Sequence, residues 1–311
     1  MKIVILDAKT LGKDIDLSVF KQFGEVEVFE TTSKEKCIES IGDAKIVLTN
    51  KVVIDAKTMD ACPNMGLICV TATGMNNIDL EYAKKRGIVV KNVAGYSTFS
   101  VAQTTFTLAL YLIGQSSYYD NYVKSKEWSK NDIFTHLDRP VCEIKGKKWG
   151  IVGFGTIGKE VAKIAEAFGA QVVYFSTSGV NNDSNYSRVE LNEMLSSCDI
   201  VSIHSPLNDK TKGLIGEKEL SLMKKGALLL NLGRGSIVDE HALANAIDKQ
   251  EIYAGLDVTT VEPIEQDNPL LNVKHKERLV IFPHVAWASV EARQRLVEMV
   301  ANNIQSYMET M

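Results

Sequence analysis

A glycine-rich turn stands in the middle of the chain, between a short apolar strand and an amphipathic helix. Residues 150–158 read GIVGFGTIG, and apolar residues follow at helical spacing, namely Val161, Ile164, Ala165 and Phe168. In such a strand–turn–helix unit the first glycine makes the turn, the second lets the backbone approach a pyrophosphate, and the third lets the helix pack on the strand. The helix N-terminus adds free N–H groups and the positive end of its dipole. Because G-x-G-x-x-G alone also occurs in ordinary turns, its placement carries the prediction of a dinucleotide site made of Gly153, Gly155, Thr156, Ile157 and Gly158.

The rest of the chain alternates between short apolar strands and helical patterns. Early strands are expected at Lys2–Leu6, Val26–Phe29, Lys45–Thr49, Leu67–Val70 and Val89–Lys91, with amphipathic segments between them such as Ile15–Phe23 and Asp55–Cys62. Six later strands are expected at Trp149–Val152, Gln171–Phe175, Ile200–His204, Ala227–Asn231, Ile252–Asp257 and Leu279–Phe282. Alternating strands and helices form parallel sheets with crossover helices. The pattern predicts an α/β protein with two doubly wound parallel-sheet domains, the larger a Rossmann dinucleotide-binding domain and the smaller flavodoxin-like.

The domain boundaries follow from the same pattern. Residues 1–98 lack a G-x-G-x-x-G of their own, so we expect them to begin a substrate-binding domain, and residues 99–286 to form the NAD(P)-binding domain. A mostly apolar helix is expected at Ser100–Ile113, and residues 116–144 read as surface loop with a short helix. The last segment, residues 287–311, has helical spacing and is expected to return to the first domain, which makes that domain discontinuous.

The composition excludes several classes of protein. With 35 basic and 39 acidic residues, the chain lacks the positive excess typical of nucleic-acid binding. No apolar run approaches the roughly 18 residues of a membrane-spanning helix, and the N-terminus lacks the apolar core of a signal peptide. The five cysteines show no C-x-x-C spacing, which indicates reduced thiols and neither disulfides nor a metal site. We therefore expect a cytoplasmic protein with no nucleic-acid or membrane partner and no bound metal.

Three residues suited to hydride-transfer chemistry each follow a predicted strand of the second domain: Arg234, Glu262 and His284. Ligands of open α/β sheets lie at the carboxyl ends of the strands. Reduction of a ketone needs a proton donor, an acid that tunes this donor, and a cation that holds a carboxylate or polarises the carbonyl. Taken singly, each residue has an ordinary alternative: a surface arginine in a turn, a solvated loop acid, or a structural histidine.

Together these segments resemble the D-isomer-specific 2-hydroxyacid dehydrogenases over essentially the whole chain, and within them the glycerate dehydrogenase and hydroxypyruvate reductase branch. The family resemblance rests on Gly153–Gly158, Ser205–Leu207 through Thr211, Asn231–Gly235, Leu256–Pro263 and Pro283–Ser289. The resemblance to this branch rests on Thr49–Lys51 and His284–Ser289. It implies an NAD(P)-dependent enzyme that reduces a small 2-keto acid, hydroxypyruvate or glyoxylate, to the D-2-hydroxy acid and catalyses the reverse. By the same resemblance His284 is the general acid/base, Glu262 is the partner that favours its protonated form, and Arg234 anchors the substrate. It also implies a homodimer, with the helix from Ser100 as a plausible contact.

The resemblance extends to residues around the substrate and the cofactor. Thr73 and Gly74 match a loop whose N–H groups hold the substrate carboxylate, and the alternative is a plain strand-to-helix turn. Lys51 adds charge to the cleft or is simply solvated, and Trp287 walls the pocket or packs between domains. The family commonly has glutamate where Gln103 stands, which leaves an ionic role there open. The cofactor set is completed by Ser176, Thr177, His204, Pro206, Thr211 and Asp257.

The choice between NAD and NADP is open in the sequence. NAD sites usually carry an acid about 20 residues beyond the glycines, bound to the ribose 2′-OH. Here Ser176-Thr177-Ser178-Gly179 follows the strand, so no carboxylate repels a 2′-phosphate, and no arginine stands nearby to attract one. We expect NAD or NADP, with a slight preference for NAD.

Two rival functions remain. One is an enzyme of the same family for D-lactate, a bulkier 2-hydroxy acid or formate, although formate oxidation needs no acid/base cycle on a hydroxyl. The other is a non-catalytic binding protein that senses the cofactor, because a fold does not fix a function. The complete set of Arg234, Glu262 and His284 argues against that second rival.

Overall fold

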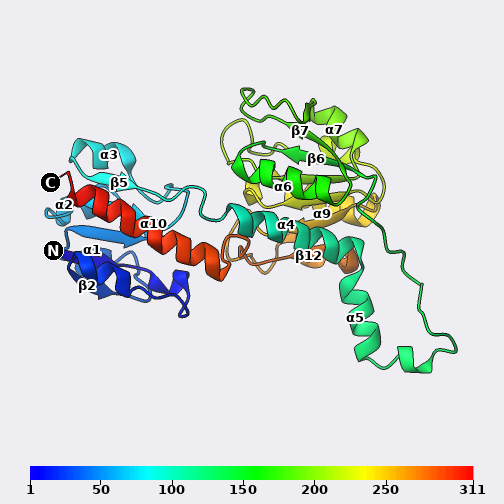
Figure 1. The fold of residues 1–311 in the computed structure, drawn as a ribbon, viewed down its shortest axis with the longest axis horizontal. Helices are drawn as coiled ribbons and strands as arrows, with labels where there is room; N and C mark the ends of the chain where they lie inside the picture. The colour runs from blue at the N-terminus through cyan, green and yellow to red at the C-terminus, as the bar shows by residue number, and fades with distance from the viewer. Residues whose placement is uncertain (311) are drawn as a thin grey trace. The chain divides into compact units, whose positions relative to one another are not determined.

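The computed structural model describes residues 1–310 and divides the chain into two compact units. Unit 1 contains residues 1–97 together with 287–311, of which 287–310 are described, and unit 2 contains residues 98–286. Each unit is an α/β layer structure built on one parallel sheet, which confirms the predicted fold class (Figure 1). Among residues 1–310 there is no helix whose length and apolar character would allow it to cross a membrane.

Unit 1 holds a sheet in the order β2-β1-β3-β4-β5, which is the flavodoxin-like order. Its strands are β1 (Lys2–Ile5), β2 (Glu25–Val28), β3 (Ile46–Thr49), β4 (Leu67–Val70) and β5 (Val89–Lys91). Because side chains alternate across a strand, Ile3 and Ile5 enter the hydrophobic core on one face while Val4 enters the core on the other. Both faces of this sheet are therefore covered.

Short helices and one long helix cover that sheet. The short ones are η1 (Ala8–Leu11), η2 (Ser18–Phe23), α1 (Cys37–Ile41), α2 (Ala56–Ala61) and α3 (Leu80–Lys85). The long one is α10 (Val290–Met308), which begins after Ser289, whose hydroxyl accepts the N–H of Ala292. Leu296, Val300 and Ile304 are fully buried in the core that α10 shares with β1, β3 and β4. The C-terminal helix and the N-terminal strands thus form one hydrophobic core.

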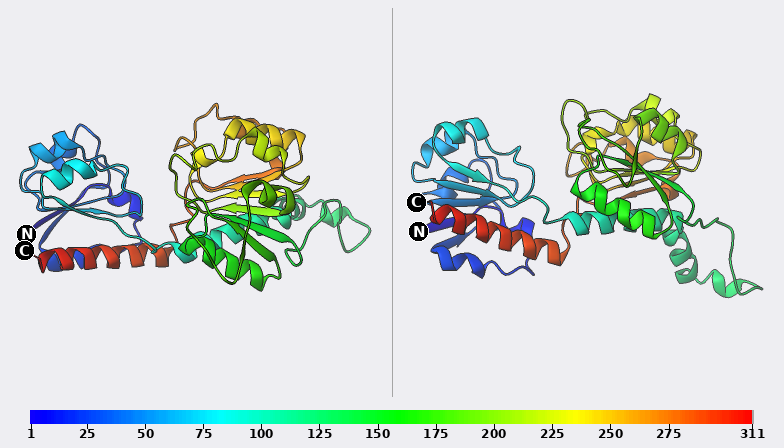
Figure 2. Two further views of the ribbon diagram at one scale, coloured as in Figure 1. Left: turned by 90° about the horizontal axis from the view of Figure 1, so that it is seen from above. Right: turned by 45° about the horizontal axis from the view of Figure 1, so that its top comes forward.

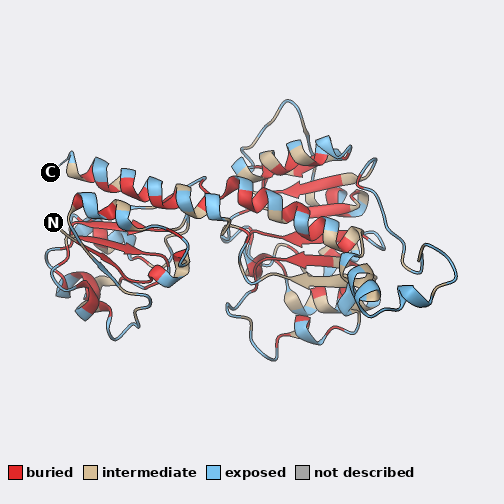
Figure 3. Ribbon diagram, turned by 60° about the horizontal axis from the view of Figure 1, so that its bottom comes forward, coloured by how far each residue is buried: buried red, intermediate tan, exposed pale blue. Residues whose placement is uncertain are grey.

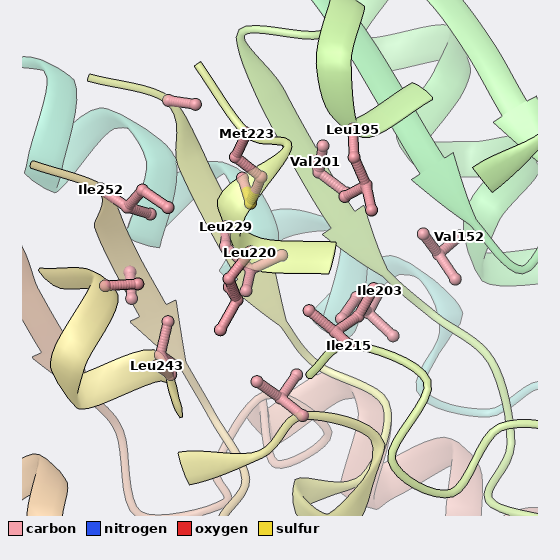
Figure 4. Close-up of a cluster of buried hydrophobic side chains, with 14 of the residues drawn as sticks. Val152, Leu195, Val201, Ile203, Ile215, Leu220, Met223, Leu229, Leu243 and Ile252 are labelled. Atoms are coloured by element: carbon pink, nitrogen blue, oxygen red, sulfur yellow. The ribbon is translucent and has the colours of Figure 1, made fainter. Parts of the chain in front are cut away.

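Unit 2 holds a sheet of seven strands in the order β12-β11-β10-β9-β6-β7-β8. The strands are β6 (Lys148–Val152), β7 (Gln171–Phe175), β8 (Ser187–Arg188), β9 (Ile200–Ile203), β10 (Leu228–Asn231), β11 (Tyr253–Leu256) and β12 (Leu279–Ile281). Figure 4 shows part of the core on one face, a single cluster of buried side chains that includes Ile203, Leu229 and Leu243. The strand order reverses between the central strands β6 and β9, so the carboxyl ends of these two strands form the topological switch point.

The helices of unit 2 lie on both faces of its sheet (Figure 3). They are α4 (Thr98–Ile113), α5 (Ser116–Lys124), η3 (Trp128–Lys130), α6 (Thr156–Ala167), α7 (Leu191–Ser197), α8 (Glu217–Ser221), η4 (Gly235–Ile237), α9 (Glu240–Lys249), η5 (Pro269–Asn272) and η6 (Lys276–Arg278). The apolar side of α4 packs on α6 and on strands β10, β11 and β12 of its own unit. This packing buries one side of α4, whereas Phe99 and Leu110 remain exposed, and the predicted dimer contact of this helix stays a prediction.

Two details of the expected secondary structure were wrong. The amphipathic pattern at Ile15–Phe23 predicts a helix, but only the 3-10 helix η2 forms there, and Phe20 and Phe23 are its buried residues. Unit 2 has a seventh strand, β8, that the sequence pattern does not reveal, because it is only two residues long and both residues are exposed.

Helix α5 and residues 125–145 form an arm that extends away from the sheet of unit 2 (Figures 1 and 2). Aromatic contacts hold the arm together. His136 stacks on Tyr122 with ring centroids 3.8 Å apart, and the hydroxyl of Tyr118 lies 2.7 Å from His136 Nε2. The arm therefore has an aromatic core of its own, and its apolar tip residues remain exposed.

Candidate functional site

The glycine turn after β6 has the geometry of a phosphate cradle. Gly153 has φ +91°, and a Cβ there would lie 2.7 Å from the backbone nitrogen of Ser205. A Cβ on Gly158 would lie 2.3 Å from the carbonyl oxygen of Gly153, so α6 packs tightly against the turn. At Gly155, the residue that caps α6, a Cβ would meet nothing within 4 Å. Two glycines are thus required by the fold, and the third leaves open space at the helix N-terminus, beside the exposed Thr156 and the partly buried Ile157.

This difference predicts separable effects of two alanine substitutions. Gly153→Ala should destabilise the fold by about 1–3 kcal/mol, because alanine disfavours a positive φ and its Cβ meets backbone atoms. Gly155→Ala should leave the free energy of unfolding within about 0.5 kcal/mol of the wild type and weaken nucleotide binding, because its Cβ enters the open space. Urea unfolding and nucleotide titration of both variants measure the two effects. Equal stability of the two variants would contradict this assignment.

Strand β9 ends beside the glycine turn with polar groups that lack partners. His204 donates its backbone N–H to Val152 at the end of β6. Both ring nitrogens of His204 and the hydroxyl of Ser205 are buried without a hydrogen-bond partner among residues 1–310. Thr211 is buried, and its hydroxyl donates to the carbonyl of the exposed Pro206, which shapes the loop after β9. Buried polar atoms normally have hydrogen-bond partners, so unpartnered ones at the switch point indicate a site where a polar ligand supplies the partner.

Burial lowers the pKa of the His204 imidazole to about 3, so the ring is neutral in the folded protein. In an unfolded chain a histidine binds a proton near about pH 6.5. Below that pH the unfolded state binds one more proton than the folded state, and the free energy of unfolding falls as the pH falls.

We expect this loss to reach up to about 1.4 kcal/mol per pH unit between roughly pH 6 and pH 4. His204→Gln should remove this component, which urea unfolding across the pH range would detect. Burial raises the pKa of the Asp257 carboxyl to about 6, which acts with the opposite sign but equally in both proteins. Identical pH slopes for wild type and variant would rule out the role of His204.

The loop after β7 carries the predicted Ser176 and Thr177. Ser176 is buried and its hydroxyl accepts the N–H of Asn181, while Thr177 is partly exposed. The expectation that no arginine stands nearby was wrong, because Arg188 on β8 donates a guanidinium N–H to the carbonyl of Gly179 at 2.9 Å. Because β8 pairs with β7, Arg188 lies beside the loop that follows β7, although this loop lies about ten residues before it in the sequence.

Arg234 lies in a braced turn after β10. The buried Asn231 donates its side-chain N–H to the carbonyl of Arg234 and accepts the N–H of Gly233. A Cβ on Gly235 would lie 2.0 Å from the carbonyl carbon of Thr259, so this turn touches the loop that follows β11. The guanidinium is exposed and donates one N–H to the carbonyl of Gly233.

Glu262 and His284 form a hydrogen-bonded pair. His284 Nδ1 lies 2.6 Å from Glu262 Oε2, and Glu262 Oε1 accepts the backbone N–H of Thr259 at 3.2 Å. The two side chains come from loops after neighbouring strands, β11 and β12. With Nδ1 engaged by the carboxylate, Nε2 is the ring nitrogen left for exchange of a proton with a ligand.

Asp257, at the end of β11, fixes the backbone of the histidine loop. Its carboxylate accepts the N–H groups of Val285 and Ala286 at 2.9 and 3.0 Å, and its carbonyl accepts the N–H of His284. His284 has φ +53°, a conformation that is costly for a residue with a Cβ. The sequence predicts a cofactor contact for Asp257, which stays a prediction. The bracing role was not foreseen, since it depends on N–H groups of a distant segment.

The remaining predicted residues lie in unit 1. Exposed Lys51 follows β3, and the backbone N–H groups of Asn50, Lys51 and Val52 donate to the buried carboxylate of Asp7 at 2.9, 2.7 and 3.4 Å. Asp7, two residues after the end of β1, was not predicted from the sequence, although a single acid after a buried strand is a signal for such a role. It holds the loop that carries Lys51.

The segment of unit 1 that contains Thr73 and Gly74 lies after β4. The Thr73 hydroxyl donates to the carbonyl of Val93 at 2.9 Å, which ties the loop to the end of β5. Trp287 packs edge to face on Tyr96, with ring centroids 6.3 Å apart, and contacts the core beneath α10. The indole therefore has a packing role in unit 1, and its role toward a substrate stays a prediction, as do those of Lys51, Thr73 and Gly74.

The chemistry of unit 2 fits a dinucleotide. The open space at Gly155 and the orphaned atoms of His204 and Ser205 lie around the carboxyl ends of β6 and β9. The pair His284–Glu262 and the turn of Arg234 follow the neighbouring strands β10, β11 and β12 of the same sheet. Among residues 1–310 no group of histidine, cysteine and acidic side chains has the arrangement of a metal site.

Comparison with known proteins agrees with this description. The protein-family model described as "D-isomer specific 2-hydroxyacid dehydrogenase, NAD binding domain" matches residues 106–286. The chain is 36% identical to a hydroxypyruvate reductase of Blautia hydrogenotrophica, over 99% of this chain and 97% of that protein. It is 35% identical to a glycerate dehydrogenase of Methylorubrum extorquens, over 99% of this chain and 96% of that protein.

A solved structure extends the likeness to the fold. An acyclic imino acid reductase in complex with NADPH and D-Arg has a TM-score of 0.85 at 28% identity, with 100% of this chain and 98% of that chain covered. Because the family model covers more than half of the chain and the relatives cover nearly all of it, the protein is an oxidoreductase that belongs to the D-isomer specific 2-hydroxyacid dehydrogenase family.

Proposed function

We propose that the protein reduces hydroxypyruvate or glyoxylate to the corresponding D-2-hydroxy acid, and catalyses the reverse reaction, with a nicotinamide nucleotide. The observation that carries this proposal is the 2.6 Å contact between His284 Nδ1 and Glu262 Oε2. The names of the two relatives, a hydroxypyruvate reductase and a glycerate dehydrogenase, support this class of substrate.

When bound, the nicotinamide supplies the hydride for the carbonyl carbon. Protonated His284 donates its Nε2 proton to the carbonyl oxygen, and in the reverse direction the neutral ring takes that proton back. Glu262, held by the N–H of Thr259, accepts from Nδ1, fixes the orientation of the ring and stabilises its positive charge. Asp257 keeps the His284 backbone in place through its loop.

Arg234 is the proposed anchor of the substrate carboxylate. Its guanidinium has five N–H donors, one of which is given to the carbonyl of Gly233. The others can form a fork on a carboxylate, which a lysine cannot reproduce. The glycine turn with Gly153, Gly155 and Gly158, together with the residues at the ends of β7 and β9, is proposed to hold the nucleotide.

The proposal is tested by following the absorbance of the reduced nicotinamide. NADH and NADPH are each offered with hydroxypyruvate, glyoxylate, pyruvate and a bulkier 2-keto acid. Faster oxidation with hydroxypyruvate or glyoxylate supports the proposal. Faster oxidation with pyruvate or the bulkier acid contradicts the substrate and favours the same-family rival. Nucleotide binding without oxidation of any pair favours the cofactor-sensing protein.

We also propose that two copies associate as a homodimer through the arm of residues 116–145. The arm exposes several large apolar side chains close together in the sequence, among which Phe134 is 88% and Leu137 is 78% exposed, and exposed apolar side chains that gather on a surface are typical of an interface. The double substitution Phe134→Ser and Leu137→Ser should convert the dimer into a monomer in sedimentation or light-scattering measurements, with the fold intact by circular dichroism. A wild-type monomer would contradict the proposal.

A further inference from the structure

The turn after β7 presents hydroxyl groups where an NAD site presents a carboxylate. Residues Ser176–Gly179, here called the serine turn, are closed by the N–H of Gly179, which donates to the carbonyl of Ser176 at 3.2 Å. Ser178 is exposed, and its hydroxyl accepts the N–H of Val180. A ribose 2′-OH that meets this turn therefore finds no strand-end acid to receive its hydrogen bond.

The one acidic residue between β7 and β8 is engaged elsewhere. Asp183 lies 3.1 Å from Lys159 of α6 and accepts the backbone N–H of Asn185. Its own N–H donates to the hydroxyl of the buried Tyr174. Because this carboxylate is already paired with a cation and a backbone donor, it does not substitute for the strand-end acid.

Arg188 supplies a positive charge to the serine turn from the neighbouring strand. Strand β8 pairs with β7 so that Arg188 lies opposite Tyr174, two residues before Ser176. The guanidinium donates one N–H to Gly179, the last residue of the serine turn, and Arg188 is exposed. Among residues 1–310 it forms no ion pair, and its one side-chain hydrogen bond there goes to a neutral carbonyl. A dianion beside the turn would receive charge-assisted hydrogen bonds from it.

We propose that the serine turn and Arg188 form a subsite for the 2′-phosphate of NADPH, and that the protein binds NADPH in preference to NADH. This inference rests on the proposed function, since it assumes that a nicotinamide nucleotide occupies the glycine turn. It goes further by assigning the cofactor preference to one side chain. The arginine without an ion pair and the missing strand-end acid favour the phosphate independently, because the arginine attracts a phosphate and the absence of the acid removes a repulsion.

The test is binding of nucleotides to the full chain without substrate, by calorimetry and by nicotinamide fluorescence. We expect NADPH to bind about tenfold or more tightly than NADH, because a charge-assisted hydrogen bond from Arg188 to the 2′-phosphate contributes an effect of about this size. 2′,5′-ADP should displace NADPH at a concentration about tenfold lower than 5′-AMP does. Inorganic phosphate should compete weakly, because it lacks the adenosine part.

Arg188→Ala should weaken NADPH binding about tenfold and change NADH binding less than about twofold. Arg278→Ala is the matched control, since Arg278 also donates one N–H to a backbone carbonyl, that of Ile247, but lies before β12 at the opposite edge of the sheet. Ser176→Asp should reverse the preference by restoring a strand-end carboxylate. Arg188→Lys keeps the charge and should lie between wild type and alanine, which guards against a variant that fails to fold.

Equal or tighter binding of NADH by the wild type would overturn the proposal. So would an Arg188→Ala variant that weakens both nucleotides alike or behaves like Arg278→Ala. Competition by inorganic phosphate as strong as that by 2′,5′-ADP would reveal a general anion site and overturn it as well. If neither nucleotide binds to the wild type, the proposed function fails too, whereas a preference for NADH leaves that function standing.

Discussion

Replacement of His284 by alanine should abolish most turnover and leave nucleotide binding unchanged. A positioned general acid/base contributes about 10²- to 10⁴-fold to a rate, so kcat for reduction of hydroxypyruvate should fall by that factor. The dissociation constant of the nucleotide should change less than about twofold, because the glycine turn lies at other strands of the sheet. Steady-state kinetics and fluorescence titration of the same preparation measure both quantities.

The chain offers a matched control for this substitution. His275 also pairs with a glutamate, with Nδ1 3.1 Å from Glu277 Oε1, but it lies before β12 and not after it. His275→Ala should therefore retain the wild-type kcat. A His284→Ala variant that keeps more than about a tenth of the wild-type kcat would contradict the role of His284 as the general acid/base, given the usual size of this contribution.

Replacement of Arg234 by lysine should be nearly as damaging, although the charge is preserved. Hydrogen bonds to charged groups contribute about 1.5–3 kcal/mol each, and lysine loses the fork that holds a carboxylate, so kcat/KM should fall about 10²- to 10³-fold. We expect KM to rise and kcat to fall, because a carboxylate held in the wrong place also misplaces the carbonyl. Initial rates over a range of hydroxypyruvate concentrations separate the two.

Arg278→Lys serves as the control, since it makes the same exchange at an arginine outside the proposed site. A wild-type kcat/KM for Arg234→Lys would mean that a simple positive charge suffices and that no fork forms. Nucleotide binding should be unaffected in both variants, which distinguishes loss of the substrate anchor from general damage to the fold.

Much of the fold follows from local patterns in the sequence. The central strands of both sheets are short apolar runs, such as Ile46–Thr49 and Leu228–Asn231, and parallel sheets buried on both faces require such runs. Arg234, Glu262 and His284 stand out because each follows one of these runs, and the structure places β10, β11 and β12 side by side. Adjacent parallel strands bring their carboxyl ends to one edge, so residues far apart in the sequence gather there.

What the sequence did not reveal depends on contacts between distant segments. Asp7 and Asp257 each follow a strand, but their bracing roles depend on backbone N–H groups from other loops. The N–H of Lys51 donates to Asp7, and the N–H of Ala286 donates to Asp257. Arg188 belongs to a two-residue strand without an apolar signature, so its approach to Gly179 could not be anticipated. Propensity likewise fails at Ile15–Phe23, where burial of two phenylalanines is achieved by a 3-10 helix.

We propose that this protein transfers a hydride and a proton to a 2-keto acid to give the D-configured product. The most direct test is to let the wild-type enzyme consume hydroxypyruvate with reduced nucleotide and to identify the product by chiral chromatography. We expect D-glycerate to accumulate in equal amount to the oxidised nucleotide. Absence of glycerate, or a racemic or L-configured product, would contradict the proposed reaction.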